Sequence, residues 1–116
     1  MNLVLTPETW QPAHLRLQLA GRLDSETAPE LERMLVTPLQ QDSWRAVVLD
    51  CAELNYIASA GLRVVLMCAK RAQSAGTRLV VCGLQAPVRE VFTVSGFLKI
   101  LSVADDFEQA QAALAA

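Results

Sequence analysis

Residues 55–62 contain the side chains whose types and spacing point most directly to chemistry. The segment leads from an apolar run into the longest helical pattern, and Ser59 stands where the N-cap of that helix is expected. An anion there is stabilised by the free N–H groups of the first turn and by the helix dipole. A phosphate on Ser59 would add about −1.5 to −2 charge, and the small neighbours Ala60 and Gly61 leave room for another protein. The same spacing also fits a serine that only caps the helix, at roughly 1 kcal/mol of stability.

Three further side chains could belong to the same surface. Asp24 follows Gly21 in a predicted turn, and it is either a turn former or part of a docking face beside Ser59. Tyr56 is expected to pack, with an exposed contact to a partner as the alternative. Arg63 is expected in the first turn of the helix, where a cation opposes the dipole. That cost indicates a salt bridge to a partner or to a phosphate on Ser59, with a plain surface charge as the other interpretation.

The remaining reactive side chains form no site. Cys51, Cys68 and Cys82 make no CxxC pair, and the single histidine, His14, lies on a distant segment. The cysteines are expected to be buried small hydrophobes in a reducing compartment, and no metal site is expected. A nucleophilic serine needs an adjacent base, and the sequence has neither a GxSxG elbow nor a glycine-rich phosphate loop. The sequence therefore predicts no enzyme and no cofactor.

Charge and hydropathy narrow the class of partner. The formal net charge is −2, and basic residues alternate with acidic ones, which argues against nucleic acid. The apolar runs are far shorter than the ~20 residues of a membrane span, and the first residues lack the basic region of a signal peptide. We therefore expect a cytoplasmic protein without membrane insertion that binds other proteins.

Hydrophobic periodicity predicts the elements that position these residues. The strands are expected at residues 2–6, 13–20, 46–49, 79–82 and 98–103. The helices are expected from Pro29 to Pro38, from Ser59 to near Gly76, over residues 86–95, and from Asp105 onward. In the strand at 13–20 leucines alternate with polar residues, which indicates one face in water.

The alternation of strands and helices requires crossover connections. We therefore predict an α/β fold with a mixed, mainly parallel β-sheet, an antiparallel N-terminal edge and about four helices. In the first helix, Leu31, Met34 and Leu35 are expected to face the core. Functional loops of such folds lie at the carboxyl ends of the strands, which selects residues 21–24 and 54–61.

Six segments resemble, in order and spacing, the signatures of the STAS domain. This family groups a cytoplasmic domain of sulfate transporters with bacterial anti-sigma factor antagonists. The segments are residues 21–31, 47–50, 54–62, 79–84, 88–92 and 107–110. The likeness covers nearly the whole chain, so we expect one STAS domain over residues 1–116.

The resemblance implies a regulatory function in transcription and signalling. Stand-alone members bind a serine kinase that is also an anti-sigma factor, of the ATPase-kinase type. Phosphorylation by that kinase ends the interaction, and a PP2C-type phosphatase restores it. Carried onto this chain, the phosphorylated residue is Ser59. The residues expected to contact the partner are Asp24, Tyr56, Ala58, Ser59, Ala60, Gly61 and Arg63.

This chain departs from the family pattern next to the serine. The aspartate that usually precedes it is Ala58, and the usual second serine is Ala60, so one hydroxyl remains. The loss of the carboxylate leaves an alternative open, in which the chain is a STAS docking module of a transport or signalling assembly and is never phosphorylated.

Overall fold

The computed structural model describes residues 2–36 and 43–115, so the predicted helix end at Pro38 lies outside the described residues. Strands and helices follow one another in the predicted order. The strands are β1 (Leu3–Gln11), β2 (His14–Leu23), β3 (Ala46–Ile57), β4 (Arg78–Cys82) and β5 (Ser102–Ala104). The helices are α1 (Ala28–Leu31), α3 (Ser59–Ala75), α4 (Ala86–Ser95) and α5 (Phe107–Ala115).

The five strands form one sheet in the order β1-β2-β3-β4-β5. β1 and β2 are antiparallel, and each later strand pairs in parallel with its predecessor. The predicted mixed sheet with an antiparallel N-terminal edge is confirmed. β1 is longer than expected and continues through Pro7, which an edge strand tolerates because its outer side needs no backbone donor.

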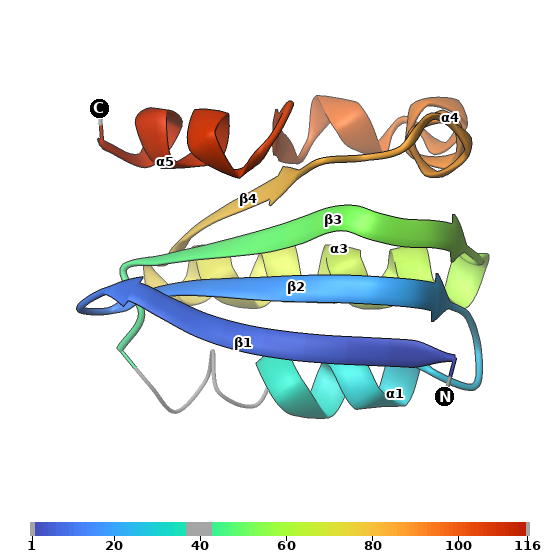
Figure 1. Ribbon diagram of the computed structural model, residues 1–116, viewed down its shortest axis with the longest axis horizontal. Helices are drawn as coiled ribbons and strands as arrows, with labels where there is room; N and C mark the ends of the chain where they lie inside the picture. Colours follow the sequence, from blue (N-terminus) through green and yellow to red (C-terminus); the bar gives the residue numbers. More distant parts are fainter. Residues whose placement is uncertain (1, 37–42, 116) are drawn as a thin grey trace.

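The larger core lies between one face of the sheet and three helices. Figure 1 shows α3 behind β2 and β3, with α4 and α5 beyond β4. The inward leucines of β2 pack with β3, β4 and the buried faces of α1, α3 and α4. In α4 the fully buried Phe92 belongs to this core, and Gly96 ends the helix in a left-handed conformation (φ 80°), as predicted.

The opposite face of the sheet is covered by α5 over β3, β4 and β5. Val48, Val80 and Cys82 pack against Ala110 of α5, with Phe107 and Leu114 at the margin. The Arg16 guanidinium of β2 lies 3.9 Å from the centre of the Phe107 ring. The polar side of β2 is therefore only partly covered: Arg16 is half-buried against Phe107, with its stem packed on the sheet, whereas Arg22 is exposed to solvent as the alternation predicted.

Two predicted boundaries are wrong. Residues 54–57 are not a loop but the last part of β3, which pairs with β2 as far as Ile57. The strand expected at 98–103 is reduced to β5, because residues Phe97–Lys99 form a 3-10 turn.

The first helix also differs from the prediction. After α1 the chain continues in wider π-helical turns over Glu32–Val36, so the inward positions shift. Leu31 and Leu35 are buried as expected, whereas Met34 is 40% exposed. Within residues 2–36 and 43–115, no helix is long and apolar enough to cross a membrane.

Candidate protein-docking site

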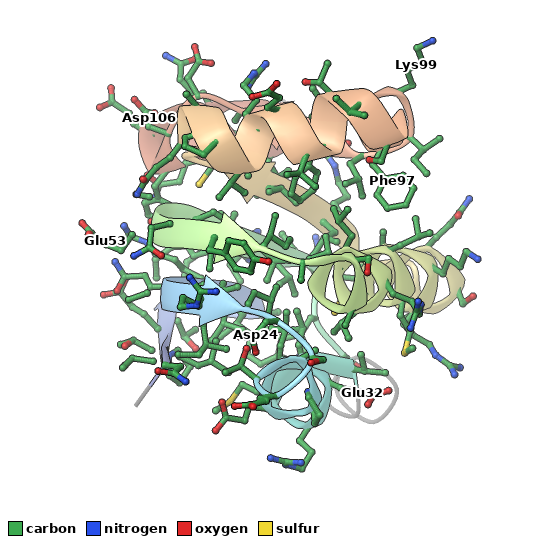
Figure 2. All side chains as sticks on the ribbon, turned by 90° about the vertical axis from the view of Figure 1, so that its right-hand side faces the viewer. Asp24, Glu32, Glu53, Phe97, Lys99 and Asp106 are labelled. Carbon is green, nitrogen blue, oxygen red and sulfur yellow. The ribbon has the colours of Figure 1, made fainter. Side chains whose placement is uncertain are left out.

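The candidate site lies where β2 and β3 end and α3 begins. Leu23 pairs with Ile57 at the last position of the parallel ladder, and the Ala58 N–H then donates to the Leu23 carbonyl at 2.9 Å. Ala58 is the only residue between β3 and α3. The start of α3 is therefore attached directly to the sheet. Figure 2 looks at this end of the molecule, with Asp24 on the turn that leaves β2.

The position of Ser59 in the helix differs from the prediction. Ala58 is the N-cap of α3, with extended backbone angles (φ −101°, ψ 172°), and Ser59 is the first helical residue. The Ala58 carbonyl accepts the first helical hydrogen bond from Leu62, at 3.0 Å. The Ser59 side chain is exposed, and its hydroxyl makes no hydrogen bond with a described residue. The Ser59 hydroxyl is therefore available to another molecule without the loss of a hydrogen bond that caps α3.

Gly61 explains how the first turn of α3 approaches the sheet so closely. A Cβ atom at this position would lie 2.7 Å from Leu23 Cγ, 2.8 Å from the Leu23 carbonyl oxygen and 3.0 Å from Ile57 Cγ1. Only a residue without a side chain fits at this distance. Gly61 is buried, so it cannot itself contact a partner, and its role is to hold Ser59 against the end of β2.

Asp24 is engaged within its own turn. Its Oδ1 accepts hydrogen bonds from the Glu26 and Thr27 N–H groups at 3.0 and 3.1 Å, and from the Thr27 hydroxyl at 3.2 Å. Partial removal from water acts to raise the pKa of Asp24, but the N–H donors of Thr27 and Glu26, with the Arg22 charge, outweigh it and lower that pKa. The carboxylate stays ionised and shapes the turn before α1, whose N-cap is Thr27.

Arg22 and Tyr56 form a second part of this surface. They are paired across β2 and β3, and the Arg22 guanidinium lies 4.0 Å from the centre of the Tyr56 ring. Arg22 Nε also lies 3.9 Å from Asp24 Oδ2. Tyr56 is 41% exposed, so it presents a ring edge to solvent as the alternative interpretation allowed. Arg22 was not among the predicted site residues. The parallel pairing of β2 with β3 brings it next to Tyr56.

Arg63 lies one turn beyond Ser59 on α3, and not in the first turn. Its side chain is exposed and has no ion-pair partner among the described residues. The first turn of α3 contains no acidic residue that could pair with it. Ala60, between Ser59 and Gly61, is half-buried.

An apolar groove borders the same end of α3. It has a volume of about 390 Å³ and is lined by Leu62, Pro87, Glu90, Val91, Val94 and Ser95. Val94 is 81% exposed, an unusual position for a large aliphatic side chain. The groove joins the first turns of α3 to α4, and the separate helix patterns of the sequence did not show that they meet.

The other reactive groups lie away from this surface or are inert. His14 pairs with Ala46 at the opposite end of the parallel ladder. All three cysteines are buried and unpaired, as predicted. Burial raises the pKa of Cys51, and it raises the pKa of Cys68 and Cys82 to about 12, so these thiols stay neutral at physiological pH.

Comparisons with known proteins agree on one family. The sequence model described as "Mlab, STAS domain" matches residues 7–102. BtrV of Bordetella bronchiseptica, which is assigned as an anti-sigma factor antagonist, is 47% identical over 95 residues, covering 82% of this chain and 81% of BtrV.

Two solved structures show the same fold. An anti-sigma factor antagonist from Mycobacterium paratuberculosis has a TM-score of 0.87 at 19% identity, with 98% of this chain and 95% of that chain covered. The Bacillus cell fate determinant SpoIIAA, solved in its phosphorylated form, has a TM-score of 0.75 at 18% identity, with 95% and 99% covered. The family model matches most of the chain, and BtrV is 47% identical over 82% of it, so this chain belongs to the STAS domain family.

Proposed function

We propose that this chain is an anti-sigma factor antagonist that binds a serine-kinase anti-sigma factor and is switched off by phosphorylation of Ser59. The observation that carries the proposal is the Ser59 hydroxyl, which is exposed and makes no hydrogen bond with a described residue at the start of α3. Because ATP is the expected phosphoryl donor, we place this switch in the cytoplasm.

The chemistry of the switch requires little of this chain. A bond forms between Ser59 Oγ and the γ-phosphorus of ATP, the bond from that phosphorus to the β–γ bridging oxygen breaks, and ADP leaves with the electron pair. The hydroxyl proton must pass to a base on the kinase, since His14 lies at the other end of the sheet. A PP2C-type phosphatase would reverse the modification by adding water across the ester.

Because residue 58 is an alanine, no carboxylate directly precedes Ser59 to orient its hydroxyl for the kinase. Asp24, the candidate replacement, already uses Oδ1 to hold its own turn. We therefore expect the kinase to supply the groups that orient the Ser59 hydroxyl. SpoIIAA has been solved in a phosphorylated form, which supports a modification of this kind on this fold.

A phosphate on Ser59 would oppose docking through charge and solvation. The groove beside it is lined by Leu62, Val91 and Val94, and the Tyr56 ring is exposed nearby on the end of β3. Ser59 follows Tyr56 in the chain and precedes Leu62 of the groove, so we expect a partner that contacts both to reach Ser59 as well. Burying a doubly charged phosphate there without a matching cation is costly. The unmodified hydroxyl imposes no such cost.

The modification is tested by incubating the chain with the serine kinase encoded beside it and ATP, followed by intact mass and peptide mapping. We expect one phosphate on Ser59 and none on the Ser59→Ala variant. Ser74→Ala is the matched control, because Ser74 is exposed on the same helix far from the site. A phosphate mapped to another residue would refute the assignment of Ser59.

Binding to the same kinase tests the docking surface. Ser59→Asp is expected to weaken binding at least tenfold, Ser59→Ala to retain it, and Val94→Asp to weaken it by a similar factor because the groove loses its apolar rim. Ile100→Asp is the matched control, since Ile100 is 64% exposed but lines a different cavity. Unchanged affinity in both Ser59→Asp and Val94→Asp would show that the partner binds elsewhere.

Ala58 favours a second candidate function, a docking module of a transport or signalling assembly that is never phosphorylated. In that case Val94→Asp still weakens binding to the assembly, whereas no kinase adds a phosphate to Ser59. The mass experiment therefore separates the two functions.

A further inference from the structure

Arg63 has no role in the fold of this chain that would explain its position. Its side chain is exposed, and it pairs with no described acid, whereas Arg16 pairs with Asp50 and Arg22 with Asp24. The buried face of α3 is formed by its neighbours on either side, Leu62 and Val64.

The geometry of α3 relates Arg63 to Ser59. The two residues are separated by four positions and therefore lie one above the other on the same helix face, with Cβ atoms about 5–6 Å apart. Long side chains on a helix lean toward its N-terminus, which directs the Arg63 guanidinium toward Ser59. An acidic group N-terminal to a basic group at this spacing is also the favourable orientation of such a pair.

We propose that Arg63 is the internal counterion of the switch and pairs with the phosphate once Ser59 carries one. This inference rests on the proposed phosphorylation and adds a residue that regulates it. In the unmodified chain the guanidinium is solvated. In the modified chain it forms charge-assisted hydrogen bonds to the phosphate oxygens, which keeps the phosphate doubly charged near neutral pH and holds it along α3.

The other charged side chains near the start of α3 are either already paired or negatively charged, so they cannot take the role proposed for Arg63. Arg22, on the end of β2, is already placed over the Tyr56 ring and beside Asp24. Asp24 accepts from its own turn, and Glu90 lines the groove on α4 with the same sign as the phosphate. Of these groups, only the Arg63 guanidinium is both positively charged and unpaired.

The test installs phosphoserine at position 59 by genetic encoding and titrates it by phosphorus NMR. We expect the second pKa of the phosphate to rise by about 0.2 to 0.4 unit in Arg63→Gln, the size of an exposed pair four residues apart. The rise should shrink in 1 M salt, where the Debye length is only about 3 Å. Arg71→Gln is the control, because Arg71 is exposed on the same helix two turns further on and should leave the pKa unchanged.

An equal phosphate pKa in the parent and in Arg63→Gln at low salt would overturn the proposal, as would an equal shift in Arg71→Gln. Because the phosphate is installed without a kinase, the titration does not depend on the proposed function. Failure of the kinase to modify Ser59 would refute that function, whereas failure of the titration would refute only the role of Arg63.

Discussion

Two polar regions of the molecule contrast in how their charges are satisfied. Under α5, Arg16 donates to Asp50 Oδ2 at 3.0 and 2.6 Å, and Asp50 is only 5% exposed. At the start of α3, Ser59 and Arg63 are exposed and unpaired. Buried charges must be paired to be tolerated, whereas exposed groups are free to meet another molecule. The first region therefore supports the fold, and the second is available for binding.

The largest expected effect is that of Asp50→Ala on stability. The substitution removes the carboxylate to which Arg16 donates two hydrogen bonds. Because the Arg16 side chain is 23% exposed and keeps Glu8 as a neighbour, we expect a loss of about 1.5–3 kcal/mol of unfolding free energy. Glu8→Ala is the control, because Glu8 lies at 3.5 Å from Arg16 with its side chain 56% exposed, and an exposed pair contributes under about 1 kcal/mol. Urea denaturation measures both, and equal losses would show that burial does not distinguish these pairs.

Gly61→Ala tests how tightly the docking region is attached to the sheet. The new Cβ would overlap Leu23 at 2.7 Å, and forced overpacking costs about 1–3 kcal/mol. The better helix propensity of alanine offsets up to about 1 kcal/mol of this. We expect a net loss of thermal stability together with weaker partner binding. A gain in stability, as propensity alone predicts, would contradict the close approach of α3 to β2.

Asp24→Ala is expected to destabilise the chain less than Gly61→Ala, and in a pH-dependent way. The folded-state pKa of Asp24 is lowered, so its carboxylate adds stability above the ordinary aspartate pKa, and this stability is lost as the pH falls through the folded value. Asp24→Asn, which retains an acceptor oxygen, isolates the charge. Denaturation midpoints of the parent and Asp24→Asn should converge in acid, and a gap independent of pH would contradict this prediction.

The smallest expected effect is that of Ser59→Ala on stability. A capping serine would contribute roughly 1 kcal/mol, but the cap of α3 is the Ala58 backbone, and the Ser59 hydroxyl makes no hydrogen bond to it. We expect a change within about 0.5 kcal/mol, as for other surface substitutions. A loss near 1 kcal/mol of unfolding free energy, measured by thermal or urea unfolding, would contradict this prediction. It would favour the alternative in which Ser59 only caps the helix.

The sequence predicted the order of elements, the mixed sheet and most helix limits, because these depend on local periodicity and on glycine and capping residues. The limits of α4 at 86–95 agree with the structure. Predictions failed where tertiary contacts overrule local pattern. β3 continues past Asp50 because its end pairs with β2, and α5 packs on the outer face of β3 and β4 and reaches Arg16 of β2. The roles of Ser59 and Asp24 in binding stay predictions.

What the sequence alone determined is the presence of a lone serine at the start of a helix that follows a buried strand, since spacing and residue type suffice to place it. Only the tertiary structure decided that the hydroxyl has no hydrogen bond to a described residue, that Gly61 packs against Leu23, and that an apolar groove lies between Leu62 of α3 and α4. These features depend on contacts between segments far apart in the chain, and no local pattern encodes the distance between them.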